Sequence, residues 1–81
     1  MKISIRLFAV AKELAGSDVV VVELPEGSSV AVLRQRLAHD VPALAAALPH
    51  MLFAVGSEYA GDEAIIAAGS DVACIPPVSG G

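Results

Sequence analysis

Residues 19–41 decide the fold, and they read VVVVELPEGSSVAVLRQRLAHDV. Residues 19–24 are a mostly β-branched run that is typical of a strand, and the Pro-Glu-Gly at residues 25–27 ends it. Ser28 or Ser29 can then cap a helix, because a serine hydroxyl accepts a hydrogen bond from an unpaired backbone N–H of the first turn. The stretch therefore predicts a strand, a turn and a helix in succession.

The second half of this stretch has the apolar spacing of an amphipathic helix. Apolar side chains recur at positions i, i+3, i+7 and i+11, so they share one helical face. These residues are Val30, Leu33, Leu37 and Val41. The polar side chains of Arg34, Gln35 and Arg36 are predicted to point away from the core.

Strand signals flank this stretch on both sides. Residues 2–8 alternate between apolar and polar side chains, as expected of a strand with one buried face. A short helical turn closed by Gly16 is predicted at residues 11–16, and Pro42 can begin another helical segment that runs through Leu48 and that Pro49 ends. Further strands are predicted at residues 51–55, 58–60 and 71–75, with a compact helical turn within residues 62–68.

Together these elements predict an α+β fold of the β-grasp, or ubiquitin-like, class. The short gap between the first two strands indicates an antiparallel hairpin. A right-handed crossover places the last strand centrally, beside the first. We therefore expect a mixed sheet of about five strands packed on one main helix. Residues 1–76 are predicted to form this domain, and residues 77–81 a flexible C-terminal tail.

Composition excludes several classes of protein. The 81 residues are 56% hydrophobic and carry five basic against nine acidic side chains, which gives a net charge of −4. This balance argues against nucleic-acid binding, which needs a surplus of Lys and Arg. We find neither the apolar core of a secretory signal nor a stretch long enough to span a membrane, so we expect a cytoplasmic protein with no membrane partner.

The charges are distributed unevenly along the chain. All basic residues lie within the first 36 positions, whereas residues 37–81 contain five acids and no Lys or Arg. Such an acidic half either favours a partner with a basic surface or is simply a solvated surface of one sign.

Few side chains suggest chemistry of their own. His39 and His50 lack the spacing of metal ligands, so we expect no metal site. Asp62 is predicted to cap a helical turn, with Glu63 near its positive end, rather than to form a catalytic pair. Cys74 is predicted to lie mid-strand as a small buried hydrophobe. We therefore expect no bound cofactor and no catalytic activity of the chain on its own.

The C-terminus is different, because it ends Pro76-Pro77-Val78-Ser79-Gly80-Gly81. The two prolines lack N–H groups, so the chain is expected to leave the sheet there as a stiff, extended spacer. Gly80 and Gly81 carry no Cβ, so the last carboxylate can enter a channel too narrow for other residues. A frayed polar terminus is the alternative, but this tail carries no charged side chain.

The candidate reactive group is the main-chain carboxylate of Gly81. With an ordinary pKa of about 3.3–3.7, it is ionised at neutral pH. It can attack the α-phosphate of ATP on a partner enzyme and form an acyl-adenylate. Sulfur can then displace AMP and leave a thiocarboxylate.

Four motifs resemble one known family. They are Leu7-Phe8-Ala9, Lys12-Glu13-Leu14-Ala15-Gly16, Asp71-Val72-Ala73 and the Pro-Pro-Val-Ser-Gly-Gly ending. Together they resemble the small subunits of molybdopterin synthase, over nearly the whole chain. The resemblance implies a β-grasp sulfur carrier with Gly81 as the reacting residue and Gly80 beside it. Partner binding is expected at Phe8, Ile75, Pro76, Pro77, Val78 and Ser79.

The resemblance also implies a set of partners. An E1-like adenylyltransferase would use ATP to activate Gly81, and a sulfurtransferase system would supply the sulfur. The tail would then insert into the large synthase subunit, which holds cyclic pyranopterin monophosphate, within a heterotetramer. Two alternatives stay open: a ubiquitin-like modifier that joins Gly81 to target lysines, and a sulfur carrier for thiamine, cysteine or thio-tRNA synthesis.

Overall fold

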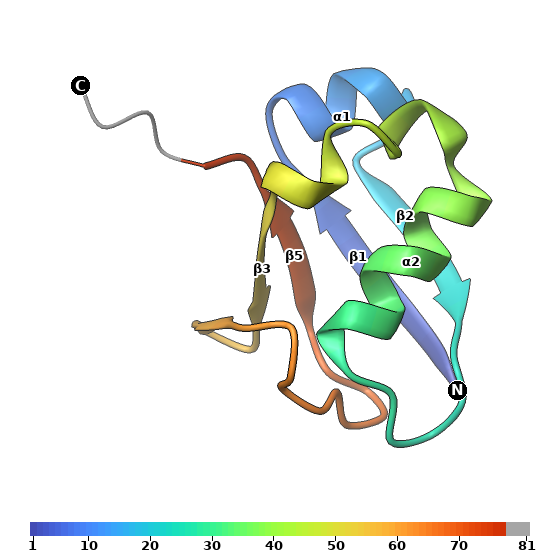
Figure 1. Cartoon of the computed structure of the whole chain (residues 1–81), viewed down its shortest axis with the longest axis vertical. Helices are drawn as coiled ribbons and strands as arrows, with labels where there is room; N and C mark the ends of the chain where they lie inside the picture. The colour runs from blue at the N-terminus through green and yellow to red at the C-terminus, as the bar shows by residue number, and fades with distance from the viewer. Residues whose placement is uncertain (78–81) are drawn as a thin grey trace.

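The computed structural model describes residues 1–77. The strands are β1 (Lys2–Leu7), β2 (Val19–Glu23), β3 (Leu52–Val55), β4 (Glu58–Ala60) and β5 (Val72–Ile75). The helices are α1 (Val10–Ala15) and α2 (Val30–Asp40), with two 3₁₀-helical turns at Pro42–Leu44 and Leu48–His50. Figure 1 shows both helices on the same face of the sheet.

The sheet has the predicted topology. Its five strands lie in the order β2-β1-β5-β3-β4. The β1–β2 hairpin is antiparallel, β5 is central and parallel to β1, and β3 runs antiparallel to both β5 and β4. The α+β, β-grasp prediction is therefore confirmed, including the position of the last strand beside the first.

The core lies between the sheet and α2. In β1 every second side chain is buried, as the alternation predicted. On α2 the side chains of Val30, Leu33 and Leu37 are fully buried, and the predicted fourth member, Val41, is only partly buried. Each such aliphatic side chain contributes about 1.5–3 kcal/mol through burial, which explains why this one helix can hold the sheet.

The two serines before α2 have different roles. Ser29 is the N-cap, and its hydroxyl accepts a hydrogen bond from the Val32 N–H at 3.3 Å. The Ser28 hydroxyl instead donates to the Pro25 carbonyl at 2.6 Å and closes the preceding turn. One serine therefore caps the helix and the other fixes its approach.

Arg34 does not point away from the core, so that prediction was wrong. Its guanidinium carbon lies 4.9 Å from the centre of the Phe53 ring. The same group donates to the carbonyls of Leu48 and Met51 and pairs with Asp62 at 2.8 Å. The long aliphatic stem lets the charged head of this α2 residue reach both carbonyls, and the Leu48 carbonyl also accepts the Met51 N–H at 3.1 Å.

Residues 62–68 also differ from the prediction. Asp62 does not cap a helical turn; its carboxylate binds Arg34, and its carbonyl accepts the Ala31 N–H at 2.9 Å. The carbonyl of Ala64 likewise accepts the Val30 N–H at 2.9 Å. The segment is irregular: it begins with a turn in which the Ala64 N–H donates to the Gly61 carbonyl at 3.0 Å, and it supplies acceptors to the unpaired N–H groups at the start of α2.

Pro49 does not end a helical segment as predicted. It lies within the second 3₁₀-helical turn, Leu48–His50, near its start. Proline suits such a position, because the first residues of a helix need no N–H donor.

Candidate functional site

The candidate site lies where β1 and β5 end. These strands are parallel, so their carboxyl ends meet at one edge of the sheet, and the chain leaves the domain there (Figure 1). The Phe8 N–H donates to the Cys74 carbonyl at 3.3 Å, which continues the pairing one residue beyond β1. This contact places Phe8 beside Ile75, the last residue before the prolines.

A third apolar side chain lies next to Phe8 and Ile75, and the three form a row across the strands. Leu52 of β3 is the register partner of Ile75. Because each alternates with a buried neighbour, Phe8, Ile75 and Leu52 all lie on the side of the sheet away from the helices. Phe8 is 44% exposed and Leu52 is 40% exposed. The predicted pair Phe8 and Ile75 is thus adjacent, and Leu52 is a neighbour that sequence reasoning missed because strand register is non-local.

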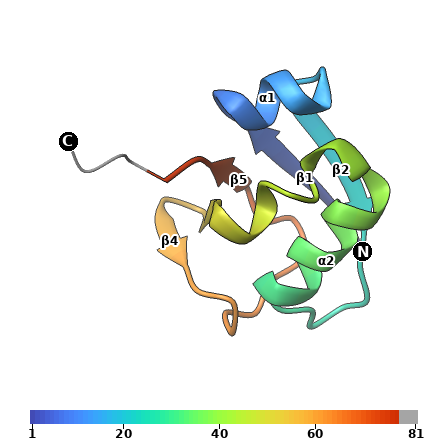
Figure 2. The same ribbon diagram turned by 45° about the horizontal axis from the view of Figure 1, so that its top comes forward.

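The row belongs to a larger surface. The register places Ala73, Ala54 and Tyr59 side by side along the same face, next to the row. We call the surface made by Phe8, Leu52, Ala54, Tyr59, Ala73 and Ile75 the open face. Figure 2 shows that helices cover only the opposite side of the sheet.

Each of the three arginines pairs with an acid from the second half of the chain. Arg6 binds Asp71 at 2.7 Å, and elsewhere Arg34 binds Asp62 and Arg36 binds Asp40. Three of the five acids in the second half of the chain are therefore paired with arginines from the first half. Hydrogen bonding to His39, followed by that to Arg36, lowers the pKa of the Asp40 carboxyl. This pairing weakens the expectation that the acidic half alone selects a basic partner.

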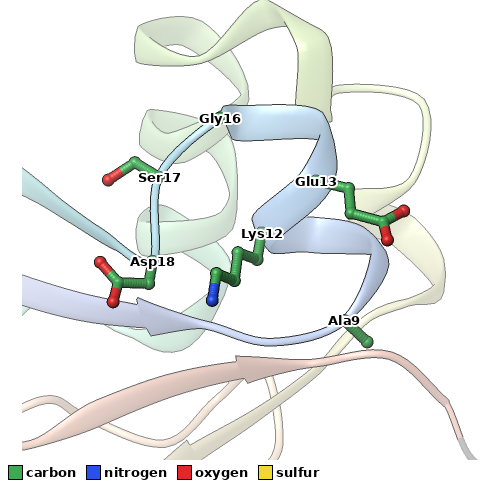
Figure 3. A pocket seen from close by; sticks show the side chains of 6 residues that line it. All are labelled: Ala9, Lys12, Glu13, Gly16, Ser17 and Asp18. Carbon is green, nitrogen blue, oxygen red and sulfur yellow. The ribbon is translucent and has the colours of Figure 1, made fainter.

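An open hollow of about 810 Å³ lies between α1 and the start of β2 (Figure 3). It is lined by Ala9, Lys12, Glu13, Gly16, Ser17 and Asp18. Lys12 extends between Asp18 on one side and Glu13 on the other. Lys12 forms no ion pair within residues 1–77. Mixed charges in an open hollow suit a macromolecular contact better than an enclosed small-molecule site.

The Cys74 thiol is buried. Burial raises the pKa of the Cys74 thiol to about 11, against a smaller lowering by the charge of Arg34, so the thiol stays protonated at neutral pH. His39 and His50 are both exposed. Within the described part of the chain, no three His, Cys, Asp or Glu side chains gather as a metal site.

Residues 5–81 match the ThiS family. The chain belongs to the ThiS family. It is 40% identical to a molybdopterin synthase sulfur carrier subunit from Dictyostelium discoideum, over 95% of this chain and 93% of that protein. It is 33% identical to the protein of the same name from Arabidopsis thaliana, over 100% of this chain and 84% of that protein.

Similar structures agree with this placement. The crystal structure of SAMP1 from Haloferax volcanii, a small archaeal modifier protein, matches with a TM-score of 0.88 and 30% identity, and the match covers 100% of both chains. The predicted membership of a sulfur-carrier family with a ubiquitin-like fold is therefore confirmed.

The ThiS-family tail is described only at its start. Pro76 is partly buried and Pro77 is exposed. Val78, Ser79, Gly80 and Gly81 lie outside the described residues, so the roles expected of them stay predictions, as does the boundary between domain and tail. Separately, no helix within residues 1–77 is long and apolar enough to cross a lipid bilayer.

Proposed function

We propose that the chain is the sulfur-carrier small subunit of a molybdopterin synthase and that Gly81 is its reacting residue. One observation carries the proposal: β5 leads the chain out of the domain at Ile75, which is partly buried and lies between the exposed side chains of Phe8 and Leu52. A docking surface therefore lies next to the point from which the Gly-Gly terminus departs. Within residues 1–77 no three His, Cys, Asp or Glu side chains gather as a metal site, and the Cys74 thiol is buried.

The proposed chemistry takes place at the terminal carboxyl carbon. A carboxylate oxygen of Gly81 attacks the α-phosphate of ATP on an E1-like adenylyltransferase, and pyrophosphate leaves. Hydrosulfide then attacks the acyl carbon of the adenylate, AMP leaves with the electron pair of the broken C–O bond, and loss of a proton gives the thiocarboxylate. In the cell a sulfurtransferase system supplies this sulfur.

The large synthase subunit is the proposed acceptor of the charged tail. The open face around Phe8 and Ile75 supplies most of the buried contact, and Pro76, Pro77, Val78 and Ser79 direct the tail toward bound cyclic pyranopterin monophosphate. In this proposal the chain binds no metal or cofactor and is not an enzyme by itself. ATP is consumed by the activating enzyme, and the complete synthase is a heterotetramer with this chain at its ends.

Intact-protein mass spectrometry tests both the activation of Gly81 and the transfer of its sulfur. The full chain is incubated with the adenylyltransferase, ATP and sulfide, and then with large subunit and cyclic pyranopterin monophosphate. We expect the chain to gain the mass difference between sulfur and oxygen and then to lose it as molybdopterin forms. A thiocarboxylate that the large subunit cannot discharge would instead indicate a carrier for thiamine, cysteine or thio-tRNA synthesis.

A second candidate function follows from the similarity to SAMP1, a small archaeal modifier protein. In that case Gly81 would form an isopeptide bond with target lysines. Activation through adenylation is common to both functions, so it does not separate them. Ladders of higher-mass conjugates in a lysate, absent when Gly81 is deleted, would support the modifier.

A further inference from the structure

We propose that Ala9 is a positioning residue whose strained turn holds Phe8 in place for docking. The inference rests on the proposed function, because it concerns the contact that Phe8 makes with the large subunit. It begins from a backbone conformation, not from a reactive side chain.

Ala9 adopts a conformation that alanine avoids. Its φ is 51° and its ψ is −124°, and it is the one non-glycine residue with positive φ in the described part of the chain. The Phe8 carbonyl accepts the Ala11 N–H at 3.1 Å, which closes a turn over residues 8–11. These angles are those of the first central position of a type II′ turn, where glycine dominates because a Cβ is strained there.

The surrounding structure holds this turn on both sides. Before it, the Leu7 N–H donates to the Asp18 carbonyl at 2.8 Å. After it, the Glu13 N–H donates to the Ala9 carbonyl at 3.1 Å, and Ala11 is fully buried. Strain of this kind persists where neighbouring contacts fix the backbone, and it occurs most often at functional sites.

The turn determines where Phe8 lies. It reverses the chain from β1 into α1, so that Phe8 stays half exposed beside Ile75. Ala9 itself lines the hollow of Figure 3 and a second one, of about 310 Å³, that also includes Phe8. The strained residue therefore borders the open face, at the edge of the sheet from which the tail departs.

The rest of the chain avoids such strain by using glycine. Every other described residue with positive φ is a glycine: Gly16, Gly27, Gly56 and Gly69. Glycine at position 9 could adopt the same φ without strain, but it would also leave the turn free to sample other conformations. A Cβ at this position limits the conformations of Phe8 before binding, which lowers the entropic cost of docking.

The test is Ala9→Gly in the full chain. We expect the melting temperature to rise by about 4 °C as the strain is relieved, since a change of that size is typical of one relieved local strain in a small domain. We expect the Kd for the large subunit, measured by titration calorimetry, to rise at least about fivefold. At saturating large subunit, sulfur transfer from the thiocarboxylate should keep the wild-type rate, because position 9 does not touch the reacting carbon.

Gly27→Ala is the matched control. Gly27 also has positive φ, at +80°, and has open space around it, but it follows β2 at the opposite end of the sheet from Phe8. This variant should lower the melting temperature and leave the Kd unchanged. It therefore separates a change in stability from a change in docking.

Each result has a stated meaning. An Ala9→Gly protein that binds as tightly as wild type, or that is not stabilised, would overturn the inference while leaving the proposed function intact. Failure of the wild-type chain to bind the large subunit would overturn the proposed function, and the inference with it. Opposite changes in stability and affinity for Ala9→Gly alone would support both.

Discussion

The two faces of the sheet are built from the same strands and differ in what covers them (Figure 2). Under α2, the side chains of Ile5 and Phe53 are at most 1% exposed. On the open face, Leu52 is 40% exposed and Tyr59 is 66% exposed. A small domain has little apolar surface to spare, so a face left uncovered next to the end of β5 indicates a surface kept for a partner.

Removing Gly81 should produce the largest loss of activity. Because it should leave the melting temperature unchanged, it distinguishes the role of the tail from the roles of the two faces of the sheet. The reacting atom is the terminal carboxyl carbon, and a displacement of one residue moves it out of reach of ATP and of the pterin. We expect sulfur transfer to fall below detection, with an unchanged melting temperature. Single-turnover adenylation and molybdopterin formation measure the first effect, and circular dichroism measures the second.

A residue added after Gly81 is the companion test. It keeps every native residue but moves the carboxylate, so it should be equally inactive. Molybdopterin formation by an extended chain, with mass spectrometry showing no trimming, would contradict the carrier hypothesis.

Truncating one leucine in the core under the covered face and one on the open face tests the comparison directly. Leu37 is fully buried under the sheet, so Leu37→Ala should cost about 2–5 kcal/mol of unfolding free energy. Leu52→Ala on the open face should cost under about 1 kcal/mol, because this side chain is already partly solvated. Denaturant unfolding measures both values.

The two variants should show the opposite order of effects when binding to the large subunit is measured. Leu52→Ala should weaken binding of the large subunit, whereas Leu37→Ala, assayed where it is still folded, should bind nearly as wild type. Equal losses of stability in the two variants would mean that the open face is structural after all.

Gly80→Ala is expected to have a smaller effect, confined to the tail. The added methyl must either clash in a narrow channel or force a different backbone angle. Adenylation or sulfur transfer should slow by at least about tenfold, equivalent to about 1.4 kcal/mol in the barrier. Wild-type rates in both steps would mean that the tail does not thread a narrow channel.

The two faces were not equally predictable from the sequence. The covered face follows from local periodicity: alternation in β1 and helical spacing in α2 identify Ile5 and Leu37 as core residues. The open face depends on register between strands far apart in sequence, which brings Leu52 beside Ile75. Local patterns do not encode that pairing, so Leu52 was missed.

Arg34 and Ala9 were missed for different physical reasons. The spacing of Arg34 on α2 predicts a solvent-exposed side chain, but its stem is long enough for the guanidinium to reach the carbonyls of Leu48 and Met51. Ala9 carries no sequence signal of positive φ, because such a conformation is normally marked by glycine. The chemistry of the tail, by contrast, was inferred directly from residue types at the terminus.

Replacing Cys74 by alanine should have the smallest effect of these substitutions, and the effect on stability should depend on pH. The Cys74 side chain is fully buried on the covered face, and no thiolate chemistry is expected of it. Cys74→Ala should therefore keep full sulfur-carrier activity and lose about 1 kcal/mol of stability at neutral pH, from the small cavity left by the sulfur. Loss of activity with normal melting would reveal a chemical role for the thiol.

The pH dependence follows from the raised pKa of the same thiol. Its ordinary value is 9.0, and burial raises it to about 11 in the folded protein. Above pH 9.0 the unfolded chain ionises while the folded chain keeps its proton, so this group lowers wild-type stability progressively until the pH reaches about 11. The alanine variant lacks this loss, so its deficit against wild type should shrink and then reverse across that window. All other side chains are the same in both proteins, so the difference between the two stability curves reports on position 74. Parallel stability curves for the two proteins from pH 8 to about 11 would show that the thiol titrates alike in the folded and unfolded chains, and would place Cys74 in contact with water.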